Sequence, residues 1–84
     1  MTRAEVYALV SAERTRQAEK WRGNHTWGAG DCSSGSIAPI VKAAVLAEEV
    51  GEVARAVLDR ESDDRLRAEL VQVAAVAVAW LEGL

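Results

Sequence analysis

Apolar residues recur at helical spacing through the first twenty positions of the chain. Val6 and Val10 are one helical turn apart, and further apolar positions continue the same period, which is typical of one face of an α-helix. Thr2, with Glu5 three positions later, has the form of a capping box, in which each residue satisfies a free backbone N–H of the other. This pattern predicts a helix from about Arg3 to Lys20.

The helical period stops in the next segment. From Arg22 to Ser36 there are glycines at positions 23, 28, 30 and 35, among Asn, Thr, Asp and Ser, and no aliphatic side chain larger than that of Ala. This composition predicts a long Gly/Ser loop. Loops of such length inside a small domain are either functional or mobile connectors, and the pattern alone leaves both alternatives open.

Apolar periodicity returns after the loop. Ser36 has the side chain of a helix cap, and Pro39 then falls in the first helical turn, where a missing N–H is tolerated. We therefore expect a second helix from Ile37 to about Asp59.

A short polar string interrupts the apolar pattern near position 60. It contains Ser62, Asp63 and Asp64, each of which can cap a third helix that runs from about Asp64 to Glu82. Neither Gly nor Pro marks the break, so one long, kinked helix is a minor alternative. The pattern predicts an all-α fold, a small three-helix bundle that forms a single domain over residues 1–84.

The composition indicates that this bundle is completed by oligomerisation. Half of the residues are apolar, but most of these are Ala or Val and none is Phe. A chain of this mass buries only about 60% of its surface on folding, and Cys32, as the only cysteine, cannot form an internal disulfide. Residues 70–81 have Gln72 as their only polar side chain, which leaves no helix face for water. We therefore expect a homodimer or homotetramer.

Charge and hydropathy exclude several function classes. The chain has 13 acidic and 10 basic residues and a net charge of −3, which disfavours nucleic acid as a partner. No basic segment leads into an apolar signal, and the longest nearly apolar run is too short to span a bilayer. We therefore expect a cytoplasmic protein without a membrane partner.

Three acidic residues interrupt the apolar second helix. At about 100° per residue, Glu48, Glu49 and Glu52 share a face with Val41 and Val45. A solvated charged face would lie opposite the apolar stripe. Carboxylates crowded in an apolar groove repel one another and take up protons unless a cation neutralises them.

A second polar pair lies in the third helix. Glu69 and Gln72 are three residues apart, as are Glu49 and Glu52, and such pairs point the same way from a helix. Facing each other across an antiparallel hairpin, they would offer three carboxylates and one amide oxygen, a set that suits Mg²⁺ or Mn²⁺. The alternative is that Glu48 and Glu52 form ion pairs with arginines such as Arg55, Arg65 or Arg67 at a subunit boundary.

The order and spacing of these acids resemble a known family. Glu48-Glu49-Val50-Gly51-Glu52, followed after sixteen residues by Glu69-Leu70-Val71-Gln72, is similar to the Glu-Glu-x-x-Glu … Glu-x-x-Asp signature of the MazG-like nucleotide pyrophosphohydrolases. That superfamily is all-α and includes the dimeric dUTPases. Upstream, Lys20-Trp21-Arg22-Gly23-Asn24-His25 is similar to the Trp-x-x-x-Gln-x-His element that often precedes the acidic helix.

The resemblance implies a reaction and a metal. It implies Mg²⁺-dependent hydrolysis of a nucleoside triphosphate between its α and β phosphates, giving a monophosphate and pyrophosphate. Glu49, Glu52 and Glu69 would be metal ligands, and Glu48 a further ligand or the base that orients water. Gln72 takes the fourth ligand position, where the family has Asp, and an amide brings no charge. The rival hypothesis is therefore a non-catalytic interaction or nucleotide-sensing module that keeps the fold.

Candidate substrate-binding residues come from the loop and from the second helix. Through the resemblance, Trp21, Asn24 and His25 would stack on and read a nucleobase. Lys42 lies two turns before Glu49 and could meet a phosphate, although lysines on helices are more often solvated or ion-paired. We expect Trp27 to anchor the loop on the core.

Overall fold

The structure is a computed structural model that describes residues 1–84. It contains three helices and one short hairpin: α1 (Arg3–Lys20), β1 (Asn24–His25), β2 (Gly28–Ala29), α2 (Pro39–Leu58) and α3 (Asp63–Glu82). The prediction of a mostly helical three-helix domain is therefore confirmed. No helix is long and apolar enough to cross a membrane.

The first helix begins at the predicted capping box. The Glu5 N–H donates to Thr2 Oγ1 and the Thr2 N–H donates to Glu5 Oε1, both at 3.1 Å. The N-terminus of α3 is capped by Ser62, whose Oγ accepts from the Arg65 N–H at 3.2 Å. Both caps depend on residues only three positions apart, so sequence alone could place these helix ends.

The predicted cap of the second helix is wrong. The Ser36 Oγ accepts from the Ala29 N–H and donates to the Ala29 carbonyl, both at 2.8 Å. Because Ser36 is engaged with β2, it does not cap a helix. Ala38 takes the N-cap position and α2 begins at Pro39, whose fixed φ suits the first helical position.

The segment between α1 and α2 is not only a loop, as the sequence suggested, because it contains a small antiparallel hairpin. Asn24 pairs with Ala29 and His25 with Gly28. Gly28 has φ +135°, and a Cβ there would lie 2.8 Å from the Ser36 carbonyl oxygen. Glycine is therefore required where the hairpin meets the segment that leads into α2.

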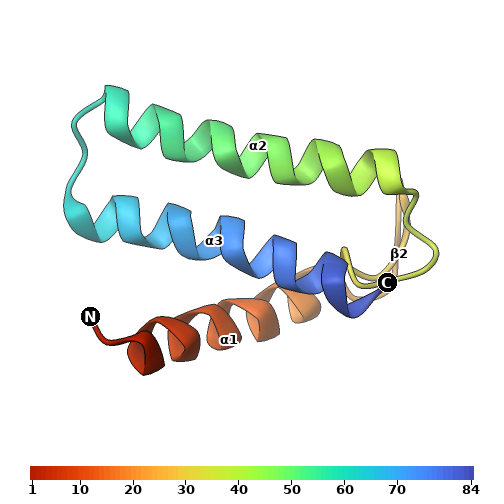
Figure 1. Cartoon of the computed structure of the whole chain (residues 1–84). Helices are drawn as coiled ribbons and strands as arrows, with labels where there is room; N and C mark the ends of the chain where they lie inside the picture. The colour runs from red at the N-terminus through yellow and green to blue at the C-terminus, as the bar shows by residue number, and fades with distance from the viewer.

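The break between α2 and α3 is a true helix end. Arg60 has φ 53°, a left-handed conformation that terminates a helix, and the chain then reverses direction. Figure 1 shows α2 and α3 running antiparallel along most of their length. The alternative of one long, kinked helix is therefore wrong.

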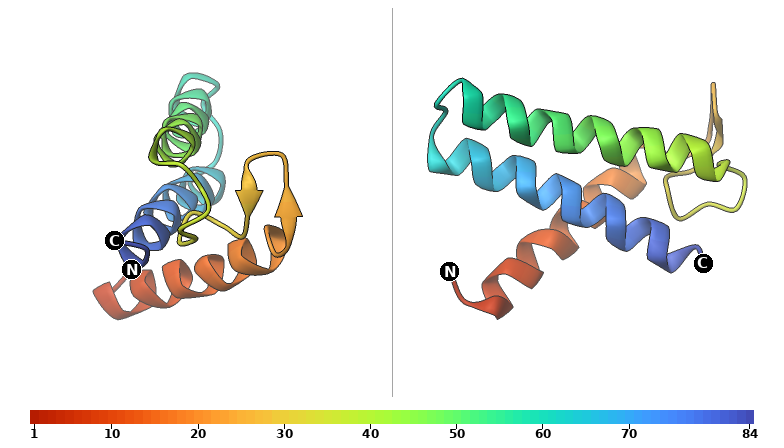
Figure 2. Two further views of the ribbon diagram at one scale, coloured as in Figure 1. Left: turned by 90° about the vertical axis from the view of Figure 1, so that its right-hand side faces the viewer. Right: turned by 45° about the horizontal axis from the view of Figure 1, so that its top comes forward.

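The third helix is the centre of the molecule. It packs against α2 on one side and α1 on the other, while α1 and α2 do not pack directly on each other (Figure 1). In Figure 2 the hairpin stands beside the α2–α3 pair, above the C-terminal end of α1.

The core is small and includes polar side chains. Only eight of the 84 residues are buried, and three of these, Gln17, Lys42 and Glu69, are polar or charged. The apolar members are Ile37, Ala56, Ala75, Val76 and Ala79. Such a core leaves many large apolar side chains exposed.

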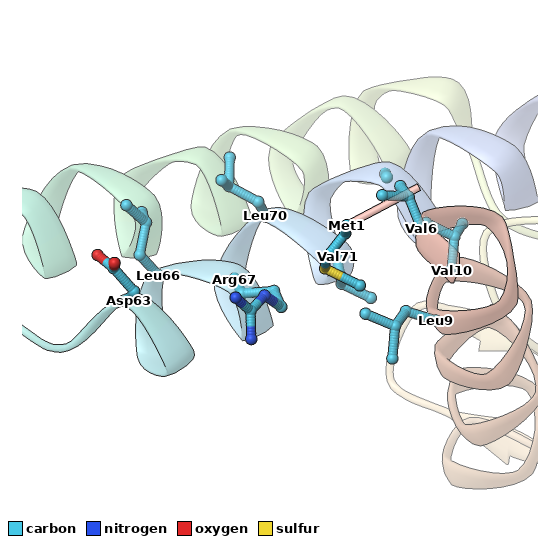
Figure 3. Close-up of a pocket in the computed structure, with 10 residues that line it drawn as sticks. Met1, Val6, Leu9, Val10, Asp63, Leu66, Arg67, Leu70 and Val71 are labelled. Carbon is cyan, nitrogen blue, oxygen red and sulfur yellow. The ribbon is translucent and has the colours of Figure 1, made fainter. Parts of the chain in front are cut away.

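A shallow apolar groove of about 420 Å³ separates the N-terminal halves of α1 and α3. Figure 3 shows Val6 and Leu9 of α1 on one wall and Leu66 and Leu70 of α3 on the other. Arg67 and Asp63 lie at the rim. We call this hollow the α1–α3 groove.

Candidate functional site

A larger cavity of about 510 Å³ lies on the hairpin side of the bundle. Its walls come from the C-terminal half of α1, the hairpin and the segment that follows it, the N-terminal half of α2, and two residues of α3. Small-molecule sites in proteins have volumes in the range of about 300–1,000 Å³. This cavity, which we call the hairpin cavity, is therefore the candidate functional site.

Two of the predicted acids line this cavity. Glu48 and Glu49 of α2 lie on its wall, together with Gln72 of α3. The Glu49 Oε2 atom is buried and has no hydrogen-bond partner. An unpartnered buried carboxylate oxygen is costly unless it is protonated or meets a cation.

The four acids influence one another across the α2–α3 hairpin. Burial raises the pKa of Glu49 above its ordinary value of 4.5, and the negative charges of Glu69, Glu48 and Glu52 raise this pKa further. Glu69 has a larger effect than either neighbour on the same helix. The negative charge of Glu69 on α3 therefore acts on Glu49 of α2 across the antiparallel helix pair.

The remaining two acids lie outside the cavity wall. Glu69 is only 3% exposed, and its Oε1 forms an ion pair with Arg65 Nη2 at 2.9 Å. Glu52 is exposed to solvent. The Glu69–Arg65 pair involves an arginine that the ion-pair alternative named, but a different acid, because neither Glu48 nor Glu52 is in any of the eight ion pairs. Glu49 has no such partner either.

The donor set suits a hard cation. Three carboxylates and the amide oxygen of Gln72 are ligand types that Mg²⁺ and Mn²⁺ accept, and the unpartnered Glu49 Oε2 provides a free ligand atom. No three acidic, histidine or cysteine side chains converge closely enough to form a ready-made metal site.

Two basic residues of α1 lie in the hairpin cavity, and the sequence analysis did not identify them. Arg16 and Lys20 are one turn apart on α1, and both line the wall. The positive charge of Lys20 opposes the rise in the pKa of Glu49. The hydrogen bond to Glu13 raises the pKa of Arg16, and the charge of Glu49 adds to this rise. The cavity is therefore lined by both acidic and basic side chains.

Aromatic side chains form the outer part of the cavity. Trp21 and His25 meet edge to face with ring centroids 5.4 Å apart, and the rings of His25 and Trp27 are 6.3 Å apart. Trp27 is 55% exposed, so it does not anchor the loop on the core as we expected. It lines the cavity instead.

Backbone hydrogen bonds fix the ring of His25. Its Nε2 lies 2.7 Å from the Gly30 carbonyl oxygen, and its Nδ1 accepts from the Trp27 N–H at 3.3 Å. Because a carbonyl only accepts and an amide N–H only donates, the proton is on Nε2. His25 therefore presents its ring face and edge to the cavity, with both nitrogens engaged.

The other two predicted substrate contacts do not line the cavity. Asn24 is exposed on β1, and Lys42 is 5% exposed and lies on the side of α2 that packs on α3. None of the eight ion pairs of the chain includes Lys42. Their roles in substrate binding stay predictions.

A partly buried ion-pair network holds the segment after the hairpin in place. Arg14 of α1 donates to Asp31 and, through Nε and Nη2, to both carboxylate oxygens of Glu82 at 3.1 and 3.0 Å. Asp31 also accepts from the N–H and hydroxyl of Ser33 at 2.9 and 2.6 Å. We call Arg14, Asp31 and Glu82 the clamp, because it ties the cavity wall to both α1 and α3.

Comparison of the chain with protein-family models, with curated proteins and with solved structures finds no match.

Proposed function

We propose that the chain is a Mg²⁺-dependent nucleoside triphosphate pyrophosphohydrolase of the MazG-like type. The observation that carries the proposal is the buried, unpartnered carboxylate oxygen of Glu49 on α2, whose pKa is raised further by the negative charges of Glu69, Glu48 and Glu52. Glu48 and Glu49 line a cavity with basic and aromatic walls. An anionic ligand with a planar ring and a bound cation would match the acidic, basic and aromatic side chains of this site.

The cation would be held by the four predicted ligands. Glu49, Glu52 and Glu69 supply carboxylates and Gln72 supplies a neutral amide oxygen, and Mn²⁺ could replace Mg²⁺. When bound there, the metal would offset the negative charge of the phosphate chain and of the acids themselves. Glu69 would then exchange its ion pair with Arg65 for the cation.

Other residues of the cavity can accept a proton, bind the phosphates and stack on the nucleobase. Glu48 is exposed and lines the cavity, so its carboxylate can accept a proton from the attacking water, whose oxygen joins the α phosphate as pyrophosphate leaves. Arg16 and Lys20 can approach phosphate oxygens. Trp21, His25 and Trp27 offer ring surfaces on which a nucleobase can stack.

Two observations favour a second candidate, a nucleotide-sensing module without efficient chemistry. Glu69 already has a cationic partner in Arg65 at 2.9 Å, and Gln72 places a neutral amide beside Glu48 and Glu49. Both features weaken the attraction of the site for a divalent cation. Such a module would bind nucleotide in the same cavity and release no pyrophosphate.

Pyrophosphate release separates the two candidates. We expect release from at least one of a panel of canonical and modified NTPs and dNTPs with Mg²⁺ or Mn²⁺. Glu48→Gln should slow it by about 10²- to 10⁴-fold, as is typical for loss of a general base. Asp64→Asn is the matched control, since the Asp64 side chain is 90% exposed and remote from the cavity. Nucleotide binding without release supports the sensing module, and neither binding nor release contradicts both candidates.

A further inference from the structure

One side of α2 that is turned away from α3 carries no polar side chain. At about 100° per residue, one arc of roughly 120° collects most of the exposed apolar positions of the helix from its first turn to its last. We define the outer face of α2 by six of these residues: Ile40, Ala43, Ala47, Val50, Ala54 and Val57. Ile40, Val50 and Val57 are 77%, 51% and 58% exposed.

The surface area of the chain is too large for an isolated domain of its mass. The accessible area is 5731 Å² for a chain of 9.0 kDa, whereas a folded monomer of that mass exposes about 4,900 Å². The excess is roughly 800 Å², which is about what one subunit contributes to a standard protein–protein interface. The area indicates that one face of the molecule is covered in solution.

We propose that a second copy of the chain covers the outer face of α2, with the two α2 helices antiparallel about a two-fold axis. Most homo-oligomers are closed by two-fold symmetry, in which one patch pairs with itself. An uncharged face can do so without placing like charges together. The antiparallel orientation also sets opposite ends of the helix dipoles side by side.

The order of side chains along the outer face sets the register. With the axis midway between Ala47 and Val50, Ala43 lies opposite the partner's Ala54 and Ile40 lies opposite the partner's Val57. The small residues near the axis let the two backbones approach closely, while the larger ones pack at the ends. Ile40 also lines the hairpin cavity, so the partner would cover the outer wall of that cavity. The pairing does not depend on the proposed activity.

The α1–α3 groove is the competing surface for a second copy. It is concave (Figure 3), and charged Arg67 and Asp63 lie at its rim. A concave groove needs a convex element of the neighbour, and such unlike pairing forms open chains unless the rotation closes. This groove therefore supplies the control for the experiment.

Sedimentation equilibrium at micromolar concentration tests which surface is used. We expect a particle of twice the 9.0 kDa chain mass, converted to monomer by Val50→Lys and left intact by Leu70→Lys. Val50 and Leu70 are equally exposed, at 51%, so the two variants are matched in their effect on the fold. A monomeric wild type, or a dimer that survives Val50→Lys, overturns the proposal.

Disulfide trapping tests the register, with Cys32→Ser as the background. The double variant Ala43→Cys/Ala54→Cys should form a covalent dimer under oxidising conditions, whereas each single variant should not. Identical positions would lie about 16 Å apart along antiparallel helices, beyond the reach of a disulfide. Trapping of either single variant as strongly as the double variant overturns the antiparallel arrangement.

Discussion

Glu49 has the only buried side-chain oxygen or nitrogen atom that lacks a hydrogen-bond partner. Burial raises the pKa of this side chain most, and the negative charges of three other acids raise it further. The sequence indicated that these acids could lie together, because pairs three residues apart on two antiparallel helices can face each other. The basic residues Arg16 and Lys20 were not predictable. Polar residues surround the C-terminal half of α1, so only its crossing of α3 determines which of them reach the cavity.

The raised pKa of Glu49 makes stability depend on pH in a known direction. The folded state holds the proton more tightly than the unfolded state, whose ordinary value is 4.5, so stability falls as pH rises from about 4.5 through the folded pKa. At pH 7 without metal, Glu49→Gln should therefore raise the melting temperature by a few degrees. A change of about 1 kcal/mol moves this temperature by roughly 4–8 °C in a domain of this size.

Differential scanning calorimetry between pH 4 and pH 8, with Glu19→Gln as an exposed control, checks this expectation. Added Mg²⁺ or Mn²⁺ should raise the melting temperature of the wild type, because the cation neutralises the acids. Glu49→Gln and Glu52→Gln should abolish that rise. An unchanged response to metal in both variants would remove them from the ligand set.

Replacement of Gln72 should have opposite effects on stability without metal and on metal binding. Gln72→Asp adds a carboxylate beside Glu48 and Glu49, so the metal-free protein should melt at a lower temperature, while the affinity for Mg²⁺ should increase. Calorimetric titration with Mg²⁺ measures the second effect. Weaker metal binding in this variant would mean that Gln72 is not a ligand, or that the site requires a neutral one.

At the scale of elements, local signals predicted most of the fold and non-local contacts determined the rest. The starts of α1 and α3 follow from caps that span three residues. The start of α2 was misplaced because Ser36 bonds to Ala29, seven residues away in a hairpin that no sequence pattern indicated. Gly28 was recognised only as a loop glycine, although the close approach of the Ser36 carbonyl requires it there.

The clamp should contribute measurably to stability. Burial tends to raise the pKa of Asp31, but the hydrogen bonds from Ser33 and Arg14 outweigh burial and hold it below its ordinary value of 3.8. Its contribution is therefore complete above about pH 3.8 and is lost as pH falls through the lower folded pKa. At pH 7, Asp31→Asn should cost about 1–3 kcal/mol, as expected when buried hydrogen-bonding groups lose a charged partner.

Urea unfolding of Asp31→Asn and of the control Asp64→Asn measures this contribution. Asp64 pairs with Arg67 at the exposed start of α3, so its replacement should change stability little. Because the clamp also holds a wall of the hairpin cavity, Asp31→Asn should weaken nucleotide binding as well. Equal stability of the two variants would contradict the role assigned to the clamp.

At the scale of the whole molecule, the small core and the large exposed apolar area are the observations behind the proposed association. Only eight residues are buried in the single chain, and α3, which was expected to be covered on all sides, still exposes Leu70, Val78 and Leu81. The composition predicted this shortage of burial, but not the surface that relieves it. That surface depends on which side of α2 is left free by α3.

Thermal stability should therefore depend on protein concentration. Dilution favours dissociation, and the separated chains are less stable than the assembly. The melting temperature should rise steadily between about 1 and 100 μM protein, by circular dichroism at low and calorimetry at high concentration. A folded 9.0 kDa species whose melting temperature ignores dilution would contradict association.

The central claim is that the acids of α2 and α3 form a divalent cation site at the hairpin cavity. The number of Mn²⁺ ions bound per chain, measured by electron paramagnetic resonance of the free ion, tests it most directly. We predict at least one bound ion per chain that Mg²⁺ displaces, retained in Asp64→Asn and lost in Glu49→Gln. Absence of binding in the wild type, with or without nucleotide, or binding unchanged in Glu49→Gln, would contradict the claim.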